Sequence, residues 1–544
     1  MPWPNRGISH RPTVTGMHAA VSSAHPHASL AGLHTIRQGG NAVDAAVAMA
    51  AALNVVEPYM SGAAGVGYMV IHDGHGSQPV VLNYNGRAPA AANVAEFPDE
   101  ATKNDGIRSP LVPGAAAGWL MALDRFGNLD ASTVFSPAIQ YAEEGYPVTI
   151  NNQWFMETNQ ARLAQWPTSV AAYFVNGRVP QAGEILKQPD LAKTLRTLAE
   201  GGIEAFYEGQ IAEEIIRFSQ ENGGLLTQED FSSYRPHWED PIAGTYRDYQ
   251  VFSPGPPCSA LEYQQTLGVV DGFDMAGLGH NSADYIHHLA EAMKLSVADR
   301  TTYAPRHDAP VDYLTSAEYL ADRRGLIDPN HAAWSGGERY TSTKQSNEVL
   351  PGNVERILKE STTHFVAADS TGMTVACTQT LGGGFGSGVV HGSTGLALNN
   401  FCNWFDLDPE SPNVIAPNKT VEMCLSPSQV WKDGKPFLVV GTPGSFGIMQ
   451  TTPQMMMNVL DHGYSIQAAI EAPRFRTGFG RELWIERRID DSVLQDLKRL
   501  GHEVNLLDSW TPFVGGGQGL MVDPDSGAYL AGADPRRDGY ALAY

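Results

Sequence analysis

Cysteine is scarce in this sequence, and its few copies are spread apart. Four occur in 544 residues, and no two have the CxxC spacing that is typical of zinc and redox sites. A set this sparse argues against a disulfide framework and favours reduced thiols that pack inside the protein. They are Cys258, Cys377, Cys402 and Cys424. Stability then rests on hydrophobic burial, which 42% hydrophobic residues in a chain of this length allow.

Positive charge is also in short supply. Lys and Arg number 36 against 59 Asp and Glu, and the formal net charge is -23, so most of the surface would repel a phosphate backbone. No uninterrupted apolar run reaches the roughly 18 residues of a membrane span, and the first residues lack the apolar core of a secretory signal. We therefore expect no nucleic-acid partner, no membrane partner and a cytoplasmic location.

Several familiar catalytic motifs are missing as well. The sequence has no GxSxG, no HExxH and no GxGxxG leading into a helix, which argues against the usual serine hydrolases, zincins and dinucleotide enzymes. The glycine-rich stretch 382–388 lacks the GK[ST] ending of a P-loop and fits close approach of backbones instead. His287, His288 and Glu291 could suggest metal ligands, but adjacent histidines point to different helix faces. We expect no metal and no cofactor.

Long segments show clear hydrophobic periods. GGNAVDAAVAMAAALNVVEP (39–58) predicts a buried helix that Asn41 caps, with Asp44 three residues on, and that Pro58 stops. Helical patterns dominate 114–224 and recur across 282–303. Strands are predicted at SGAAGVGYMVIHDG (61–74), QPVVLNYNGRAPA (78–90), THFVAAD (363–369), MTVACTQTL (373–381), GLALNNF (395–401) and KPFLVVGTPGS (435–445). Two sheets with helices outside them, an α+β fold, would account for both patterns.

Hydroxyl side chains gather where the predicted hairpin begins. Threonine is a good strand residue, so a Thr-Thr pair at the start of a hairpin is ordinary. The alternative is chemical, because the polar segment 341–361 just before Thr362 could be cut. Cleavage there would free an α-amine with a pKa of about 7.7 to 8.0, which could take the proton from the hydroxyl of its own residue. Spacing alone does not choose between the two interpretations.

A set of short motifs runs through nearly all of the chain. They are GGNAVDAAVA at 39–48, VPG at 112–114, GHNSADYIHHLAEAMKLSVADR at 279–300, TTHF at 362–365, TQTL at 378–381, FGSG at 385–388, LNN at 398–400, LSP at 425–427, GTPGS at 441–445 and the terminal ADPRRDGYALAY. In these motifs the sequence resembles the γ-glutamyltransferase (γ-glutamyltranspeptidase) family of N-terminal nucleophile (Ntn) hydrolases. The resemblance implies a four-layer αββα sandwich with two stacked, mainly antiparallel sheets.

The resemblance also implies a precursor that cuts itself. Cleavage between Ser361 and Thr362 would give a large subunit, 1–361, and a small catalytic subunit, 362–544, which stay together in one αββα domain as a heterodimer. Pairing of two such heterodimers is an open alternative. The implied reaction needs no cofactor, and the implied partner is a small-molecule amide substrate.

Four positions acquire catalytic roles from the resemblance. Thr362 matches the nucleophile, whose hydroxyl would attack first the carbonyl of Ser361 and later the scissile carbonyl of the substrate. Thr380, 18 residues further on (380 minus 362), matches the threonine that orients the nucleophile. Gly444 and Ser445 match the pair whose backbone N–H groups form the oxyanion hole, here with Ser in place of the second Gly.

The sequence departs from the family where its members bind the glutamyl α-amino and α-carboxylate groups. Asn85 stands at the position of the usual arginine, and Arg87 is the nearest guanidinium. Further changes are Gly382 after TQTL, Phe401 and Trp404 after Asn400, and Met423 and Cys424 before the SP dipeptide. An α-ammonium group would lose its anionic partner, and an unpaired buried charge costs on the order of several kcal/mol.

These departures shape the expected function. Residues 401–417 look shorter than the lid loop of typical transpeptidases, which favours water as the acceptor. Phe401, Trp404, Met423 and Cys424 could line a pocket for an acyl group, or they could only pack under the loop. We expect an autoprocessing amidohydrolase or acylase that works through an acyl-threonine. The alternatives are a true γ-glutamyl hydrolase or transpeptidase acting on glutathione-like compounds, with Arg87 as its clamp, and an inactive, uncleaved scaffold.

Overall fold

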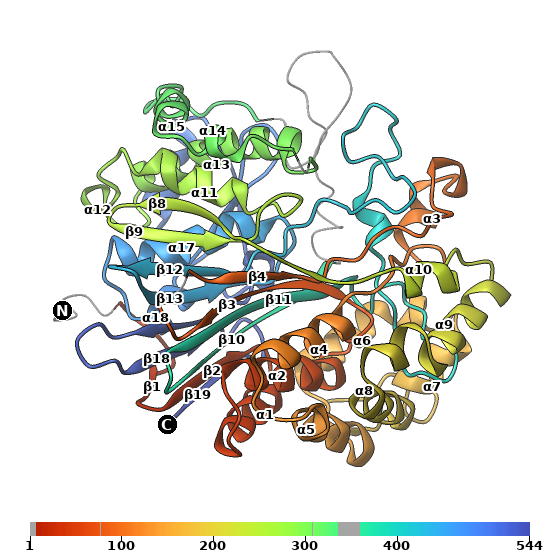
Figure 1. Ribbon diagram of the computed structural model, residues 1–544. Helices are drawn as coiled ribbons and strands as arrows, with labels where there is room; N and C mark the ends of the chain where they lie inside the picture. Colours follow the sequence, from red (N-terminus) through yellow and green to blue (C-terminus); the bar gives the residue numbers. More distant parts are fainter. Residues whose placement is uncertain (1–6, 77, 307, 336–359) are drawn as a thin grey trace.

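The computed structural model describes residues 7–76, 78–306, 308–335 and 360–544 (Figure 1). Within these ranges two seven-stranded sheets lie face to face in the middle of the molecule, and helices cover the outer face of each. This αββα arrangement confirms the α+β, Ntn-type fold predicted from the sequence. No helix in the described ranges is long and apolar enough to cross a membrane. Most of the segment 341–361, proposed above as the cut region, lies outside the described residues.

The first sheet contains the predicted hairpin at its centre. Its neighbouring strands all pair antiparallel. In spatial order they are β19 (Tyr540–Ala543), β2 (Ala19–Ser23), β10 (Glu360–Asp369), β11 (Met373–Gly383), β3 (Val66–Asp73), β4 (Val80–Asn83) and β7 (His237–Glu239). Because β10 and β11 lie between strands from the N-terminal part of the chain, the segments before and after Thr362 share one sheet.

The second sheet is also antiparallel throughout. Its order is β1 (Val14–Gly16), β18 (Tyr529–Ala533), β17 (Gln518–Val522), β13 (Lys435–Gly441), β12 (Ser428–Lys432), β9 (Tyr249–Ser253) and β8 (Ile242–Tyr246). It packs against the first sheet through contacts of β17 with β10 and of β13 with β11. Two small sheets complete the strands, one of β5 (Tyr146–Pro147) and β6 (Ile185–Leu186), the other of β14 (Phe475–Thr477), β15 (Glu482–Glu486) and β16 (Glu503–Leu507).

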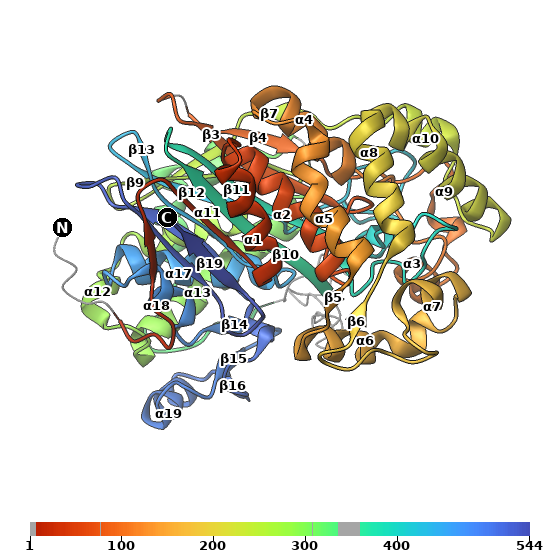
Figure 2. The ribbon, with the colours of Figure 1, turned by 90° about the horizontal axis from the view of Figure 1, so that it is seen from below.

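Helices form the two outer layers (Figure 2). The layer on the first sheet is built from α1 (Pro26–Arg37), α2 (Ala42–Val56), α4 (Ala115–Phe126), α5 (Ala131–Glu144) and α8 (Pro189–Tyr207). The layer on the second sheet is built from α11 (Leu261–Val270), α13 (Ala283–Tyr303), α17 (Gly447–Leu460) and α18 (Ile466–Glu471). The others are α3 (Glu100–Asn104), α6 (Ile150–Leu163), α7 (Pro167–Tyr173), α9 (Gln210–Glu221), α10 (Gln228–Ser232), α12 (Met275–Leu278), α14 (Val311–Leu314), α15 (Ala317–Arg324) and α19 (Asp491–Arg499).

Helix α2 forms as its sequence predicts. The side chain of Asn41 accepts the N–H groups of Val43 and Asp44, and the Asp44 carboxylate accepts the Asn41 N–H at 2.8 Å, which completes a capping box. Every residue from Ala42 to Val56 is buried. The helix ends at Val56, and Glu57, between the helix and Pro58, places a carboxylate at its buried end.

One predicted strand is wrong. GLALNNF (395–401) forms no strand, apart from an isolated bridge between Ala397 and Val390. Its backbone is satisfied locally, because Ser387 donates its N–H to the Leu398 carbonyl at 2.8 Å and His391 donates to the Leu396 carbonyl at 3.0 Å. The apolar residues that suggested a strand are buried in a folded loop instead.

Candidate active site

Thr362 lies at an irregularity of the central hairpin. Ser361 pairs with Gly382 and Thr363 pairs with Gln379, so the single residue Thr362 faces two residues of β11, Thr380 and Leu381. The extra residue of this β-bulge lies in β11, so the side chains of β10 keep their regular alternation. The structure therefore places the two predicted threonines across from each other. Thr362 is 3% exposed and Thr380 is 1% exposed.

The side chain of Thr362 faces the second sheet. Successive side chains of a strand point to opposite faces, so Thr362 and His364 share one face of β10. His364 packs against Gly441 at the end of β13, where a Cβ would lie only 2.4 Å from Cε1 of the imidazole. Thr363 lies on the opposite face, toward α2, and donates its hydroxyl to Glu57 at 3.4 Å. Thr362 is thus directed at the segment that follows β13.

Gly444 and Ser445 form the turn that follows β13. Both have left-handed backbone, with φ of 134° and 57°. Their carbonyls accept the N–H groups of Gly447 and Ile448, so the turn leads directly into α17. Within the described residues, the N–H groups of Gly444 and Ser445 donate to no protein acceptor. Two available main-chain donors in adjacent peptides are what an oxyanion hole needs.

The C-terminal part of the chain links the nucleophile to this turn. Arg537 donates from Nη1 to the Thr362 carbonyl at 3.0 Å. It also packs on Gly516, where a Cβ would lie 2.7 Å from Cδ of Arg537. The neighbouring Gly515 lies beside Gly444, whose Cβ would be 3.5 Å from Cα of Gly515. Arg537, Gly515 and Gly516 therefore connect the predicted nucleophile with the predicted oxyanion turn.

Aromatic rings extend from the end of β11 to the start of α17. Phe401 lies against Gly382, where a Cβ would be 3.4 Å from Cε2 of the ring. Its ring centre is 5.8 Å from that of Trp404, which is 4.7 Å from that of Phe446. All three are at least nine-tenths buried. In the described part of the chain, Nε1 of Trp404 has no hydrogen-bond partner. We call Phe401, Trp404 and Phe446 the aromatic wall.

A buried arginine supports the far end of the wall. The guanidinium carbon of Arg300 lies 4.0 Å from the ring centre of Phe446. Arg300 also pairs with Glu262 at 2.7 Å and with Glu422 at 2.6 Å. The Glu422 carboxylate, next to Met423, is thus already engaged with a cation.

Asn400 and Cys424, the other residues expected to bind substrate here, are buried. Asn400 accepts the Gly383 N–H at 2.7 Å and donates to the Asn104 carbonyl at 2.7 Å, so it fixes the end of β11. Cys424 is 2% exposed and reduced, like the other three cysteines. Met423 pairs with Cys258 through an isolated β-bridge, which holds this segment beside the start of α11.

Asn85 and Arg87 lie in the strand-like segment after β4. Asn85 donates to the Tyr68 hydroxyl at 2.9 Å and is buried. Arg87 donates to the hydroxyl of Ser233 and, at 3.3 Å, to the carbonyl of Asp230, both at α10. The guanidinium is therefore held at α10.

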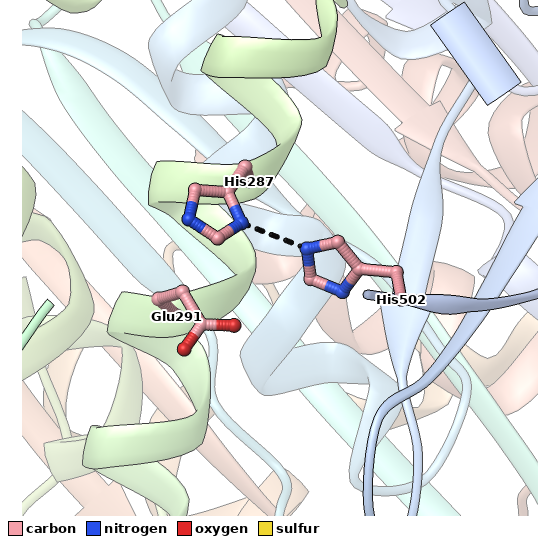
Figure 3. Close-up of side chains that lie close together, drawn as sticks. All are labelled: His287, Glu291 and His502. Carbon is pink, nitrogen blue, oxygen red and sulfur yellow. Dashed lines mark hydrogen bonds between the residues drawn. The ribbon is translucent and has the colours of Figure 1, made fainter. Parts of the chain in front are cut away.

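The candidate metal ligands on α13 divide between two sides of the helix. His287 is buried, and its Nδ1 is 2.9 Å from Nε2 of His502, as Figure 3 shows. Glu291 lies within 4.8 Å of both rings, but its carboxylate is paired with the ammonium of Lys294 at 2.7 Å. Burial, with the Lys294 charge, lowers the pKa of His502 to about 3. The cluster is therefore a pair of neutral histidines beside the ion pair of Glu291 and Lys294. His288 lies outside it.

Sequence reasoning missed three contributors to the site. They are Glu57, which contacts Thr363, Arg537, which contacts Thr362, and Phe446, which contacts Trp404. The members of each contact lie far apart in the sequence, and only the fold brings them together. One signal was available for Glu57, because a carboxylate that follows a buried, Ala-rich helix needs a reason for its burial.

Comparison with known proteins gives consistent matches over almost the whole chain. The family described as Gamma-glutamyltranspeptidase matches residues 28–544. The glutathione hydrolase proenzyme of Escherichia coli (strain K12) is 35% identical over 538 residues, covering 95% of this chain and 90% of that protein. The acylase ACY 1 proenzyme of Pseudomonas sp. (strain V22) is 36% identical over 546 residues, covering 97% of this chain and 94% of that protein.

A solved structure agrees with these sequence matches. The crystal structure of cephalosporin acylase from Bacillus halodurans superposes with a TM-score of 0.89 at 32% identity, covering 100% of this chain and 98% of that one. The resemblance drawn from the short motifs is confirmed by these matches. The chain belongs to the gamma-glutamyltranspeptidase family, and it is a hydrolase of amide bonds.

Proposed function

We propose that the protein is an autoprocessing amidohydrolase of the acylase type. It cuts its own chain before Thr362, and the resulting subunits, 1–361 and 362–544, remain together as a heterodimer. The mature enzyme then hydrolyses the amide bond of a small or acyl substrate through an ester on Oγ1 of Thr362. The names of the two curated relatives, both described as proenzymes, support the processing step.

The observation that carries this proposal is the bulge at Thr362. It sets one hydroxyl residue opposite Thr380 and directs it at a turn with two available N–H donors. Such donors lower a tetrahedral transition state by roughly 3 kcal/mol each. The base would be the α-amine that cleavage frees on Thr362 itself. His364 is unsuited to that role, because burial lowers its pKa to about 3 and leaves it too weak a base near neutral pH.

The side chains expected around the acyl group favour a substrate that carries no α-ammonium group. The aromatic wall reaches from Gly382 to the oxyanion turn and offers apolar surface to an acyl chain. Glu422, next to Met423, and Glu262 both pair with the Arg300 guanidinium behind the wall. An ammonium group bound there would therefore compete with Arg300 for either carboxylate.

A matched pair of substrates tests this proposal. Glutaryl-p-nitroanilide and γ-glutamyl-p-nitroanilide differ only in the α-amino group, so their kcat/KM ratio isolates the cost of that group. We expect the glutaryl compound to be preferred by at least about tenfold, which corresponds to roughly 1.4 kcal/mol. Preference for the γ-glutamyl compound would instead favour the glutathione-hydrolase alternative. An oxamate amide in the same assay covers the case of a very small acyl group.

A denaturing gel tests processing independently of the substrate. The purified wild type should give two bands, of 361 and 183 residues (544 minus 361). A single band of full length with no amidase activity would favour the inactive scaffold. Mass spectrometry of the small subunit after brief exposure to substrate should find the acyl group on Thr362.

A further inference from the structure

Two buried charged residues contact β10 at and next to the nucleophile. Glu57, just after α2, is 2% exposed and accepts the hydroxyl of Thr363. Arg537, just before β19, is 7% exposed and donates to the carbonyl of Thr362. The two side chains thus hold consecutive residues of β10, one through its main chain and the other through its side chain.

The two charges depend on each other. In the described part of the chain, Nε of Arg537 has no partner, and its Nη1 has only the Thr362 carbonyl and the sulfur of Met60. A guanidinium this poorly hydrogen-bonded inside a protein needs an anion nearby. The attraction of Glu57 is the largest effect that opposes the lowering of the Arg537 pKa by burial. The reverse holds for Glu57, whose pKa is raised to about 7 by burial and lowered by Arg537.

Three other ionisable groups act on Glu57 or Arg537: Asp538, Tyr59 and Asp534. Asp538 adds a negative charge near Glu57, but its carboxylate is held by Thr149 and Asn151 at the start of α6. Tyr59 lies near both charges but stays neutral near pH 7, because burial raises its pKa well above the ordinary value. Asp534 also attracts Arg537 but is paired directly with Arg474 and Arg536.

We propose that Glu57 and Arg537 are positioning residues for the nucleophile. Arg537 holds the main chain of Thr362, and Glu57 both holds Thr363 and balances the charge of Arg537. This inference rests on the proposed function, in which Thr362 supplies the nucleophile and its α-amine accepts the proton. Neither residue touches the reacting atoms, and each acts through the placement and electrostatics of Thr362.

The electrostatic part of this role has a definite sign. A nearby positive charge disfavours the ammonium form of the α-amine and lowers its pKa, whereas a nearby negative charge raises it. Glu57→Gln leaves the Arg537 charge unbalanced, so the acidic limb of kcat/KM should move to lower pH. Arg537→Met removes the positive charge, and Glu57, whose pKa is then no longer lowered by Arg537, takes up a proton, so the limb should move to higher pH. A loss of packing alone would not move the two variants in opposite directions.

The experiment measures kcat/KM for glutaryl-p-nitroanilide between pH 5 and 10 in the mature wild type and the variants. We expect each single variant to shift the acidic midpoint by about one pH unit, in the directions given above. The double variant Glu57→Gln, Arg537→Met should return to within about 0.3 unit of the wild type, because the charges are removed together. Glu57→Asp and Arg537→Lys keep their charges, so they should keep the wild-type midpoint even if turnover falls.

Glu291→Gln is the matched control, because it neutralises a buried carboxylate near a cation as Glu57→Gln does, but on α13. It should leave the midpoint unchanged. If a substitution slows maturation, the pH dependence of precursor cleavage, followed on denaturing gels, gives the same midpoint comparison.

Shifts in the same direction, or no shift beyond about 0.2 unit in either single variant, would overturn the inference. The proposed function would be contradicted by a different result, namely amidase activity or self-cleavage of the chain in Thr362→Ala. The two failures are therefore distinguishable.

Discussion

Ser445 carries a hydroxyl that the oxyanion role does not need. Its Oγ is buried and has no partner within the described ranges, although the adjacent N–H is the predicted donor. Ser445→Ala should therefore keep kcat within about threefold, because the backbone donor stays. It should raise the free energy of unfolding by about 1 kcal/mol, because an unsatisfied polar group is removed. Steady-state kinetics and urea unfolding measure the two effects.

The two readouts separate two roles for that hydroxyl. A fall of kcat by more than about tenfold would show that Oγ of Ser445 itself donates to the transition state. Ser445→Gly, which also keeps the N–H and suits the left-handed backbone, is the matched control.

Thr380 is the second position that can be tested alone. Its Oγ1 accepts the N–H of Gly382 at 2.8 Å while the residue faces Thr362 across the bulge. Thr380→Ala should slow both self-cleavage and turnover by about 10- to 100-fold, since small displacements of a nucleophile cost that much. Thr380→Ser keeps the hydroxyl and should stay near the wild type. Equal rates in the two variants would remove Thr380 from the site.

The elements around the site differ in how far their sequences specify them. Helix α2 is local in origin, because its cap, its apolar interior and its stop at Pro58 are all visible in twenty residues. The hairpin β10–β11 is equally clear from two strand-like runs around the STG turn. GLALNNF has the apolar residues of a strand, but its backbone hydrogen-bond partners, Ser387 and Ala64, lie in turns outside it. No local sequence pattern reveals those partners.

The cap of α2 provides a prediction at this scale. Asn41 accepts two helix N–H groups and also donates to the Phe126 carbonyl, so it joins α2 to the end of α4. Asn41→Ala should lower the free energy of unfolding by about 2 kcal/mol, the upper end for a helix cap. Urea unfolding of uncleaved Thr362→Ala protein measures it. Asp130→Ala, which removes the exposed cap of α5, is the control and should cost less; equal losses would contradict the special role of Asn41.

At the scale of the whole molecule, the site is assembled by the sandwich and not by any one segment. Thr362 comes from the first sheet, Gly444 from the end of a strand in the second sheet, and Arg537 from the loop before β19. Family motifs pointed to the first two residues, and nothing in the sequence paired Glu57 with Arg537. The side-chain types of the aromatic wall were predictable, whereas the order of its rings and its support by Arg300 required the fold.

Buried histidines should make the whole fold sensitive to acid. Burial lowers the pKa to about 3 for His25, His364 and His502 and to about 4 for His391. In the unfolded chain these histidines have the ordinary pKa of about 6.5. Below that pH the unfolded chain therefore binds protons that the folded chain does not bind. Stability is therefore complete above pH 6.5 and falls as the pH drops toward 4, by up to about 1.4 kcal/mol per unit for each histidine.

This pH dependence can be assigned to single residues. Urea unfolding of Thr362→Ala protein at pH 7.0, 6.0 and 5.0 gives the slope, and adding His364→Asn should reduce it by about 1 kcal/mol per unit. His75→Asn, which changes an exposed histidine, is the control and should leave the slope as it was. A slope that His364→Asn does not change would mean that His364 becomes protonated in the folded state.

The central claim is that Thr362 both cuts the chain and carries the substrate's acyl group. The most direct measurement is a denaturing gel and an amidase assay of purified Thr362→Ala beside the wild type. The account predicts one band of 544 residues and no activity for the variant, against two bands and activity for the wild type. Efficient cleavage or full activity in Thr362→Ala would contradict it.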